Sequence, residues 1–159
     1  MSKGRIAVGL AIGALAIAGC GSSSSSSSEP SVGQFKSAFA AERAKTKSLG
    51  TDVVAAVQGA GTKTASELAT KFASLSSETT KAADAFRSMQ VPDKYKSQVT
   101  TLANALDAAA ADMKKISQAA QSNDAAAART AAESLVTHAE KIQSTDQALT
   151  KALGLPSGG

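Results

Sequence analysis

Aromatic, sulfur-containing and chain-breaking residues are scarce in this sequence. Its 159 residues include no tryptophan, one cysteine, one histidine and three prolines, and 3% of them are aromatic. A single cysteine excludes a disulfide within the chain. The shortage of aromatic residues argues against a strand-rich sandwich. Alanine is abundant instead, which favours closely packed helices in a single domain.

The sequence also lacks a dense basic cluster. The formal net charge is +4, from 17 basic and 13 acidic residues. Two of the basic residues, Lys3 and Arg5, lie at the very start of the chain. Without them, 15 basic residues face 13 acidic ones, a net charge of +2. We therefore expect no nucleic-acid partner.

Residues 1–19 have the three parts of a secretory signal. Lys3 and Arg5 give a positive start, and the 13 residues from Ile6 to Ala18 are apolar apart from glycine. That run is too short for a membrane-spanning helix, which needs about 20 residues. Small residues then lead into Cys20, the single cysteine.

The stretch Ile17-Ala18-Gly19-Cys20 resembles the lipobox of bacterial lipoprotein precursors. The resemblance implies that the Cys20 thiol receives a diacylglyceryl group and that the chain is cut between Gly19 and Cys20. Two or more acyl chains, palmitate for example, would then hold the protein at a membrane. Two alternatives remain: an uncleaved membrane helix with an incidental cysteine, and a secretory signal without lipid.

A serine-rich tether is predicted at residues 20–31, where seven serines follow Gly21. The stretch has no apolar surface to offset the entropy of ordering it. Glycosylation of these serines is left open. The expected organisation is a signal peptide at 1–19, the lipidated cysteine and tether at 20–31, a helical domain at 32–155 and a disordered tail at 156–159.

Four stripes of apolar or small side chains follow the tether at helical spacing. Capping or turn residues precede each stripe: Ser31, Thr64, Pro92 and Asp124. Gly50 interrupts the first stripe without changing its phase, so we favour one long helix there. Short connections make neighbouring helices antiparallel, which predicts an all-α, up-down-up-down four-helix bundle. Alanines at many contact positions are expected to let the helices approach closely.

His138 is the lone histidine and lies on the apolar stripe of the fourth helix. A haem held by His138 with Met89 or Met113 is conceivable. Folding the last two helices as a hairpin, however, puts His138 level with Leu106, about 10 Å along the axis from Met113. Neither the paired Glu-x-x-His motif of di-iron bundles nor a Cys-x-x-Cys-His motif is present. We therefore expect a core or boundary histidine and no metal site.

Threonines interrupt the apolar stripes at Thr46, Thr79 and Thr145. Their hydroxyls can donate to a carbonyl one turn earlier, so they need no ligand. The alternative is a small ligand site that His138, Thr79 and Thr145 share. Asp107 and Asp112 are five residues apart and do not share a helix face, so paired-carboxylate chemistry is not expected.

The sequence predicts a lipid-anchored, extracytoplasmic module that binds an unidentified envelope protein, with no catalysis and no cofactor beyond the lipid on Cys20. The alternative is a carrier of a small molecule, metal or haem near His138. The chain also resembles the small, alanine-rich helical lipoproteins of high-GC Gram-positive bacteria, which implies the outer face of the cytoplasmic membrane. In a Gram-negative host, Gly21 replaces the aspartate that usually retains lipoproteins at the inner membrane.

Overall fold

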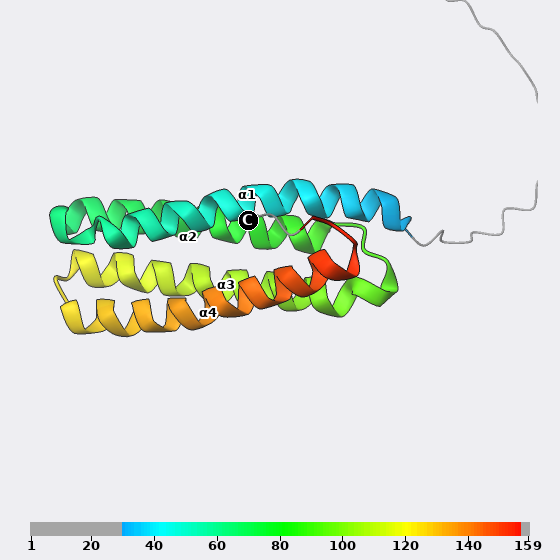
Figure 1. The fold of residues 1–159 in the computed structure, drawn as a ribbon. Helices are drawn as coiled ribbons and strands as arrows, with labels where there is room; N and C mark the ends of the chain where they lie inside the picture. The colour runs from blue at the N-terminus through cyan, green and yellow to red at the C-terminus, as the bar shows by residue number, and fades with distance from the viewer. Residues whose placement is uncertain (1–29, 157–159) are drawn as a thin grey trace, which may run out of the picture.

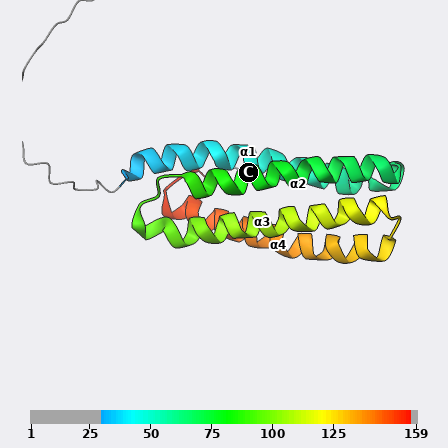
Figure 2. The ribbon, with the colours of Figure 1, turned by 180° about the vertical axis from the view of Figure 1, so that it is seen from behind.

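The computed structural model describes residues 30–156. This part of the chain holds no strand and consists of four long helices with one short 3-10 turn, η1 (Ala60–Thr62). The helices are α1 (Val32–Gln58), α2 (Ala65–Ser88), α3 (Asp93–Gln121) and α4 (Ala125–Ala152). They lie along one axis and alternate in direction (Figures 1 and 2). The prediction of an all-α, up-down-up-down bundle is confirmed.

The predicted signal peptide, Cys20 and nearly all of the predicted tether lie outside the described residues, as do residues 157–159. The predicted helical domain begins and ends close to the structural boundaries. Ser31 caps α1, and the chain turns out of α4 at Leu153 and Gly154. Helix α1 runs without a break through Gly50, as expected.

Side chains expected to cap helices do so. Thr64 and Glu67 form a reciprocal capping box at the start of α2, in which the Thr64 hydroxyl accepts from the Glu67 N–H and the Glu67 carboxylate accepts from the Thr64 N–H. The Asp124 carboxylate accepts from the N–H groups of Ala126 and Ala127 at the start of α4. These caps fix where the helices begin and therefore which side chains face inward.

Two helices end on a left-handed residue. Asn123 has φ of 53° after α3, and Gly154 has φ of 59° after α4. Each allows the next N–H to reach back to the last turn: Asp124 to the Ala119 carbonyl and Leu155 to the Thr150 carbonyl, both at 2.9 Å. The first of these turns folds α4 back against α3.

Helix α3 is the centre of the bundle. It approaches α2 and α4 closely, whereas α1 lies against α2. Close approach at alanine-rich contacts is therefore found on both sides of α3. The same expectation does not hold between α1 and α4, where no comparable approach occurs. The bundle is tight on the two sides of α3 and looser around α1, which lies less closely against α2 and least closely against α4.

The core is divided into two clusters along the axis. We call the end that holds residue 30 and the close of α4 the proximal half, and the end that holds the α1–α2 and α3–α4 connections the distal half (Figure 1). The proximal cluster contains most of the large side chains: Phe35, Phe39, Phe86, Val91, Tyr95, Val99, Leu102, Leu106, Leu149 and Leu153. The distal cluster is built on Phe72, Leu75, Met113, Ile116, Leu135 and three alanines.

Candidate binding groove

In the proximal half, α1 is tied to α4. Lys36 Nζ donates to the Gly154 carbonyl at 3.1 Å, and Arg43 Nε donates to the Asp146 carboxylate at 2.9 Å. Beneath these contacts, the Phe35 ring stacks on Tyr95 with centroids 5.4 Å apart. Long polar side chains over an aromatic core hold this side of the bundle closed.

In the distal half, the corresponding positions carry short or apolar side chains. Seven-residue steps along α1 lead from Lys36 and Arg43 to Gly50 and Val57. The same steps along α4, from Asp146 back toward its start, give alanine at 139, 132 and 125. In an antiparallel pair these positions face one another. None of these side chains can donate or accept a hydrogen bond, so these positions supply no polar contact like those of Lys36 and Arg43.

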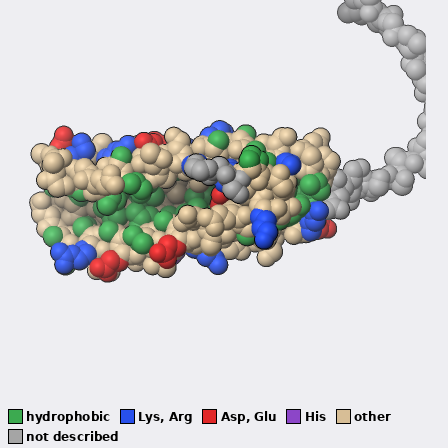
Figure 3. All heavy atoms as spheres, viewed as in Figure 1, with side chains coloured by type: hydrophobic (Ala, Val, Ile, Leu, Met, Phe, Trp, Pro, Cys, Tyr) green, Lys and Arg blue, Asp and Glu red, His purple; other side chains and the backbone are tan. Residues whose placement is uncertain are grey.

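A hollow with an apolar floor opens between α1 and α4 in the distal half (Figure 3). It contains a pocket of about 370 Å³ to which all four helices contribute. The 13 residues that line it are Val57, Ala60, Ala65, Leu68, Phe72, Ile116, Ala119, Ala120, Asn123, Asp124, Ala125, Ala128 and Ala132. We call this the distal groove.

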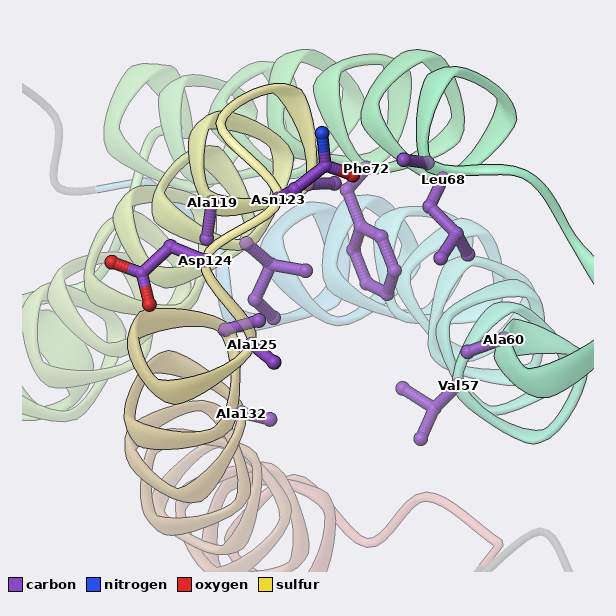
Figure 4. Close-up of a pocket in the computed structure, with 13 residues that line it drawn as sticks. Val57, Ala60, Leu68, Phe72, Ala119, Asn123, Asp124, Ala125 and Ala132 are labelled. Carbon is purple, nitrogen blue, oxygen red and sulfur yellow. The ribbon is translucent and has the colours of Figure 1, made fainter.

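Within the distal groove, Val57 of α1 and Ala132 of α4 stand on opposite walls, with Phe72 of α2 between and behind them (Figure 4). Two of the 13 lining residues, Asn123 and Asp124, have polar side chains. The Asp124 carboxylate is engaged by the N–H groups at the start of α4. The groove therefore offers apolar contact and almost no hydrogen bonding.

His138 lies at the boundary of the α3–α4 contact and outside the groove lining. Its Nδ1 is 2.7 Å from Asp112 Oδ2, and Lys115 Nζ donates to Asp112 Oδ1 at 2.9 Å. Asp112 is 2% exposed, and its contacts with the His138 ring and the Lys115 ammonium compensate for the burial of its carboxylate. The histidine thus contributes to the contact between α3 and α4.

The His138 ring contacts Asp112 rather than Leu106, the residue with which the sequence places His138 level. Side chains on a helix lean toward its N-terminus, which for α4 is the end nearest the connection to α3. Met113 faces α2 instead, where its Sδ lies 3.7 Å from Thr79 Oγ1. His138 and Met113 therefore point to different helices.

The three threonines use their hydroxyls within their own helices, as expected. Thr46 donates to the Glu42 carbonyl, Thr79 to the Leu75 carbonyl at 2.8 Å, and Thr145 to the Lys141 carbonyl at 2.8 Å. Neither Thr79, Thr145 nor His138 lines the distal groove. The structure does not gather these three predicted ligand residues around that pocket.

Asp107 and Asp112 of α3 face different neighbours, in agreement with their spacing. Asp107 pairs with Arg87 of α2, and this carboxylate raises the pKa of the Arg87 guanidinium above its usual value. Asp112 faces α4 through His138. The burial of Asp112 was not foreseen from the sequence.

Residues 30–156 contain no group of three or more His, Cys, Asp or Glu side chains placed to hold a metal ion. No helix in that range is both long and apolar enough to span a membrane. No family model matches the chain, and no curated protein or solved structure matches it significantly.

Proposed function

We propose that this chain is a lipid-anchored, extracytoplasmic binding protein without catalytic activity, and that the distal groove is its binding surface. The observation that carries the proposal is the apolar groove that stays open between α1 and α4. Concave apolar sites with a few polar groups are typical of ligand binding. Val57, on the wall of the groove, is 48% exposed. Such surface is otherwise costly to leave in water.

The anchoring half of the proposal is supported by the lipobox-like stretch that ends at Cys20 and by the serines that follow it. Helix α1 has 27 residues and is therefore about 40 Å long. The groove lies near its far end, about one helix length from the point where the tether joins the bundle. A ligand could reach the groove while the lipid remains in the membrane.

The absence of a catalytic step is supported by the groove lining. Acid–base or nucleophilic catalysis needs converging polar side chains near the bound substrate. The groove supplies one amide, Asn123, and one carboxylate already used as a helix cap. This favours binding over chemistry.

Lipidation is tested by growing the producing cells with labelled palmitate. Wild-type protein should incorporate the label and the Cys20→Ala variant should not. A matched Ser24→Ala variant in the tether should be labelled like wild type. Equal labelling of the wild-type and Cys20→Ala proteins, or none in either, would contradict the anchor.

Groove binding is tested with the chain from residue 20 onward carrying Cys20→Ala, which contains the whole described bundle without lipid. An environment-sensitive anilinonaphthalene dye should gain fluorescence with this protein. Ala132→Trp places a large side chain on the groove wall and should reduce the gain at least fivefold. Ala148→Trp, on an exposed position of the same helix, should leave it unchanged. Equal dye binding by both variants would rule out the groove as the binding surface.

A further inference from the structure

The size and lining of the distal groove define the kind of molecule that can fill it. We propose that the groove binds the hydrocarbon chain of one long-chain fatty acid, with the carboxylate left in water. This inference rests on the proposed function and names the ligand class of that same site.

The volume fits one chain. A 150 Å³ apolar protein cavity holds one benzene molecule, which corresponds to about 25 Å³ per carbon atom. At that ratio the 370 Å³ pocket accommodates about 15 carbons. A diacyl lipid has about twice as many chain carbons and does not fit.

The same volume argues against a helix from a partner protein. A helix with its side chains is 10–12 Å wide and rises 1.5 Å per residue. An 11-residue segment would therefore occupy on the order of 1,200 Å³. The pocket is about three times too small to enclose such a segment, so a partner helix could insert only part of its surface.

The chemistry of the lining also favours a hydrocarbon. Eleven of the 13 lining residues are Ala, Val, Leu, Ile or Phe. No lysine or arginine is among them, so a carboxylate gains nothing by entering. Affinity then comes from transfer of the apolar chain out of water, and each fully buried methylene strengthens binding by a factor of about four.

The lipid proposed for Cys20 is a poor candidate for the occupant. Val57 lies 25 residues after the start of α1, about 38 Å along the helix. The ten residues from Cys20 to Pro30 extend at most about 36 Å. The acyl chains add their own length to this reach, so distance alone leaves the lipid on Cys20 as a rival occupant. Its two or more chains exceed a pocket that accommodates about 15 carbons, and this favours a separate molecule.

The experiment displaces a fluorescent fatty acid from the Cys20→Ala chain with saturated fatty acids of 8 to 18 carbons. Affinity should rise about two- to fourfold per added carbon and level off near 14 to 16 carbons. The fatty alcohol of each length should bind within about threefold of the acid, because no cation lines the pocket. Affinity independent of chain length would overturn the proposal.

Two valines on one helix give a matched pair of variants. Val57 lines the pocket and Val54 does not, although both are about half exposed. Val57→Asp should weaken binding of the 14-carbon acid at least tenfold, and Val54→Asp should change it less than twofold. Ala132→Trp and Ala148→Trp repeat the comparison on α4 in case an aspartate disturbs folding, which circular dichroism would reveal.

Other results separate this inference from the proposed function. Dye binding that requires the groove, without any dependence of fatty-acid affinity on chain length, would refute the fatty acid and leave the binding surface in place. A dimer in analytical ultracentrifugation that Val57→Asp dissociates would show that a second copy covers the groove, and would overturn the fatty acid as its occupant. Loss of groove dependence for both dye and fatty acid would contradict both proposals.

Discussion

The proximal and distal halves of this bundle are built from the same four helices, but the α1–α4 side is closed in the proximal half and open in the distal half. In the proximal half, Phe35 and Phe39 are at most 1% exposed, and Arg43 bridges to α4. In the distal half, the core-facing Ala56 is 3% exposed, whereas Val57, which follows Lys36, Arg43 and Gly50 at seven-residue steps, is 48% exposed. The comparison shows that one helix can be an ordinary core element at one end and the wall of an open groove at the other.

The difference between the halves comes from which side chains occupy equivalent positions. At seven-residue steps, α1 changes from long cationic side chains to Gly50 and Val57. The facing positions of α4 are alanines until Asp146. Small residues allow two helices to approach each other. The helices come into contact only if the side chains of the other helices beneath them leave room. Here Phe72 and Ile116 fill the floor of the distal half, and the α1–α4 side stays open.

The largest expected effect on the free energy of unfolding comes from truncating a side chain of α1 in the proximal half rather than in the distal half. Phe39→Ala removes a fully buried ring from the proximal cluster and should lower the free energy of unfolding by about 3–5 kcal/mol. Val57→Ala in the distal half should lower it by less than about 0.5 kcal/mol, because the side chain is already half exposed. Urea denaturation followed by circular dichroism measures both. Similar losses for the two variants would mean that α1 is as well packed at Val57 as at Phe39.

Much of this comparison could be anticipated from the sequence. The apolar stripes and the caps at Ser31, Thr64 and Asp124 predicted four helices and their directions. The open side could not be anticipated, because alanine is compatible with either close approach or empty space. The choice depends on the volume of residues on other helices, which a single helical stripe does not reveal.

The buried carboxylate was also missed, for a related reason. Asp112 directly precedes Met113 on a helix whose apolar face is wide enough to contact both α2 and α4. A pattern read as one stripe places such an acid at the surface. The sequence does place its partner, His138, on the apolar stripe of α4. Pairing the two residues, however, requires knowledge of the register between α3 and α4. That register depends on the turn at Asn123, where one residue more or less moves the contact by 1.5 Å.

A smaller effect is expected at the contact between His138 and Asp112. His138→Ala removes one of the two side chains that compensate the buried carboxylate and should lower stability by about 1–2 kcal/mol. Thermal unfolding of this variant beside Thr137→Ala, an exposed neighbour, isolates the effect. If His138 instead belonged to a ligand site, the variant would lose binding without losing stability.

A substitution in the proximal half is expected to increase stability. The Thr150 hydroxyl is buried and has no hydrogen-bond partner among the described residues. Thr150→Val keeps the shape and removes the unsatisfied group, which should raise the free energy of unfolding by about 1 kcal/mol. Chemical denaturation is the measurement. A loss of stability would show that the hydroxyl has a partner in solution.

The smallest expected effect lies at the distal end, in the capping box of α2. The Thr64 N–H and hydroxyl bond the Glu67 carboxylate and lower its pKa below the ordinary value of 4.5. The pKa of Glu67 is lower in the folded than in the unfolded state. The ionised carboxylate therefore stabilises the fold at neutral pH, and this stabilisation is lost as the pH falls through the folded-state pKa. Subtracting the pH profile of Glu67→Gln from that of the wild type, between pH 7 and pH 3, should reveal this loss. Glu140→Gln on α4 serves as the control, and a difference profile that is flat would exclude the contribution.

The most direct test of the central claim is to locate the bound ligand on the bundle. Two-dimensional NMR of the Cys20→Ala chain, titrated with a 14-carbon fatty acid, reports each backbone amide separately. We expect shifts concentrated at Val57, Ala60, Phe72, Ala128 and Ala132, with the amides of Phe35, Phe39 and Leu149 unchanged. Shifts centred on the proximal half, or no saturable shifts at all, would contradict it.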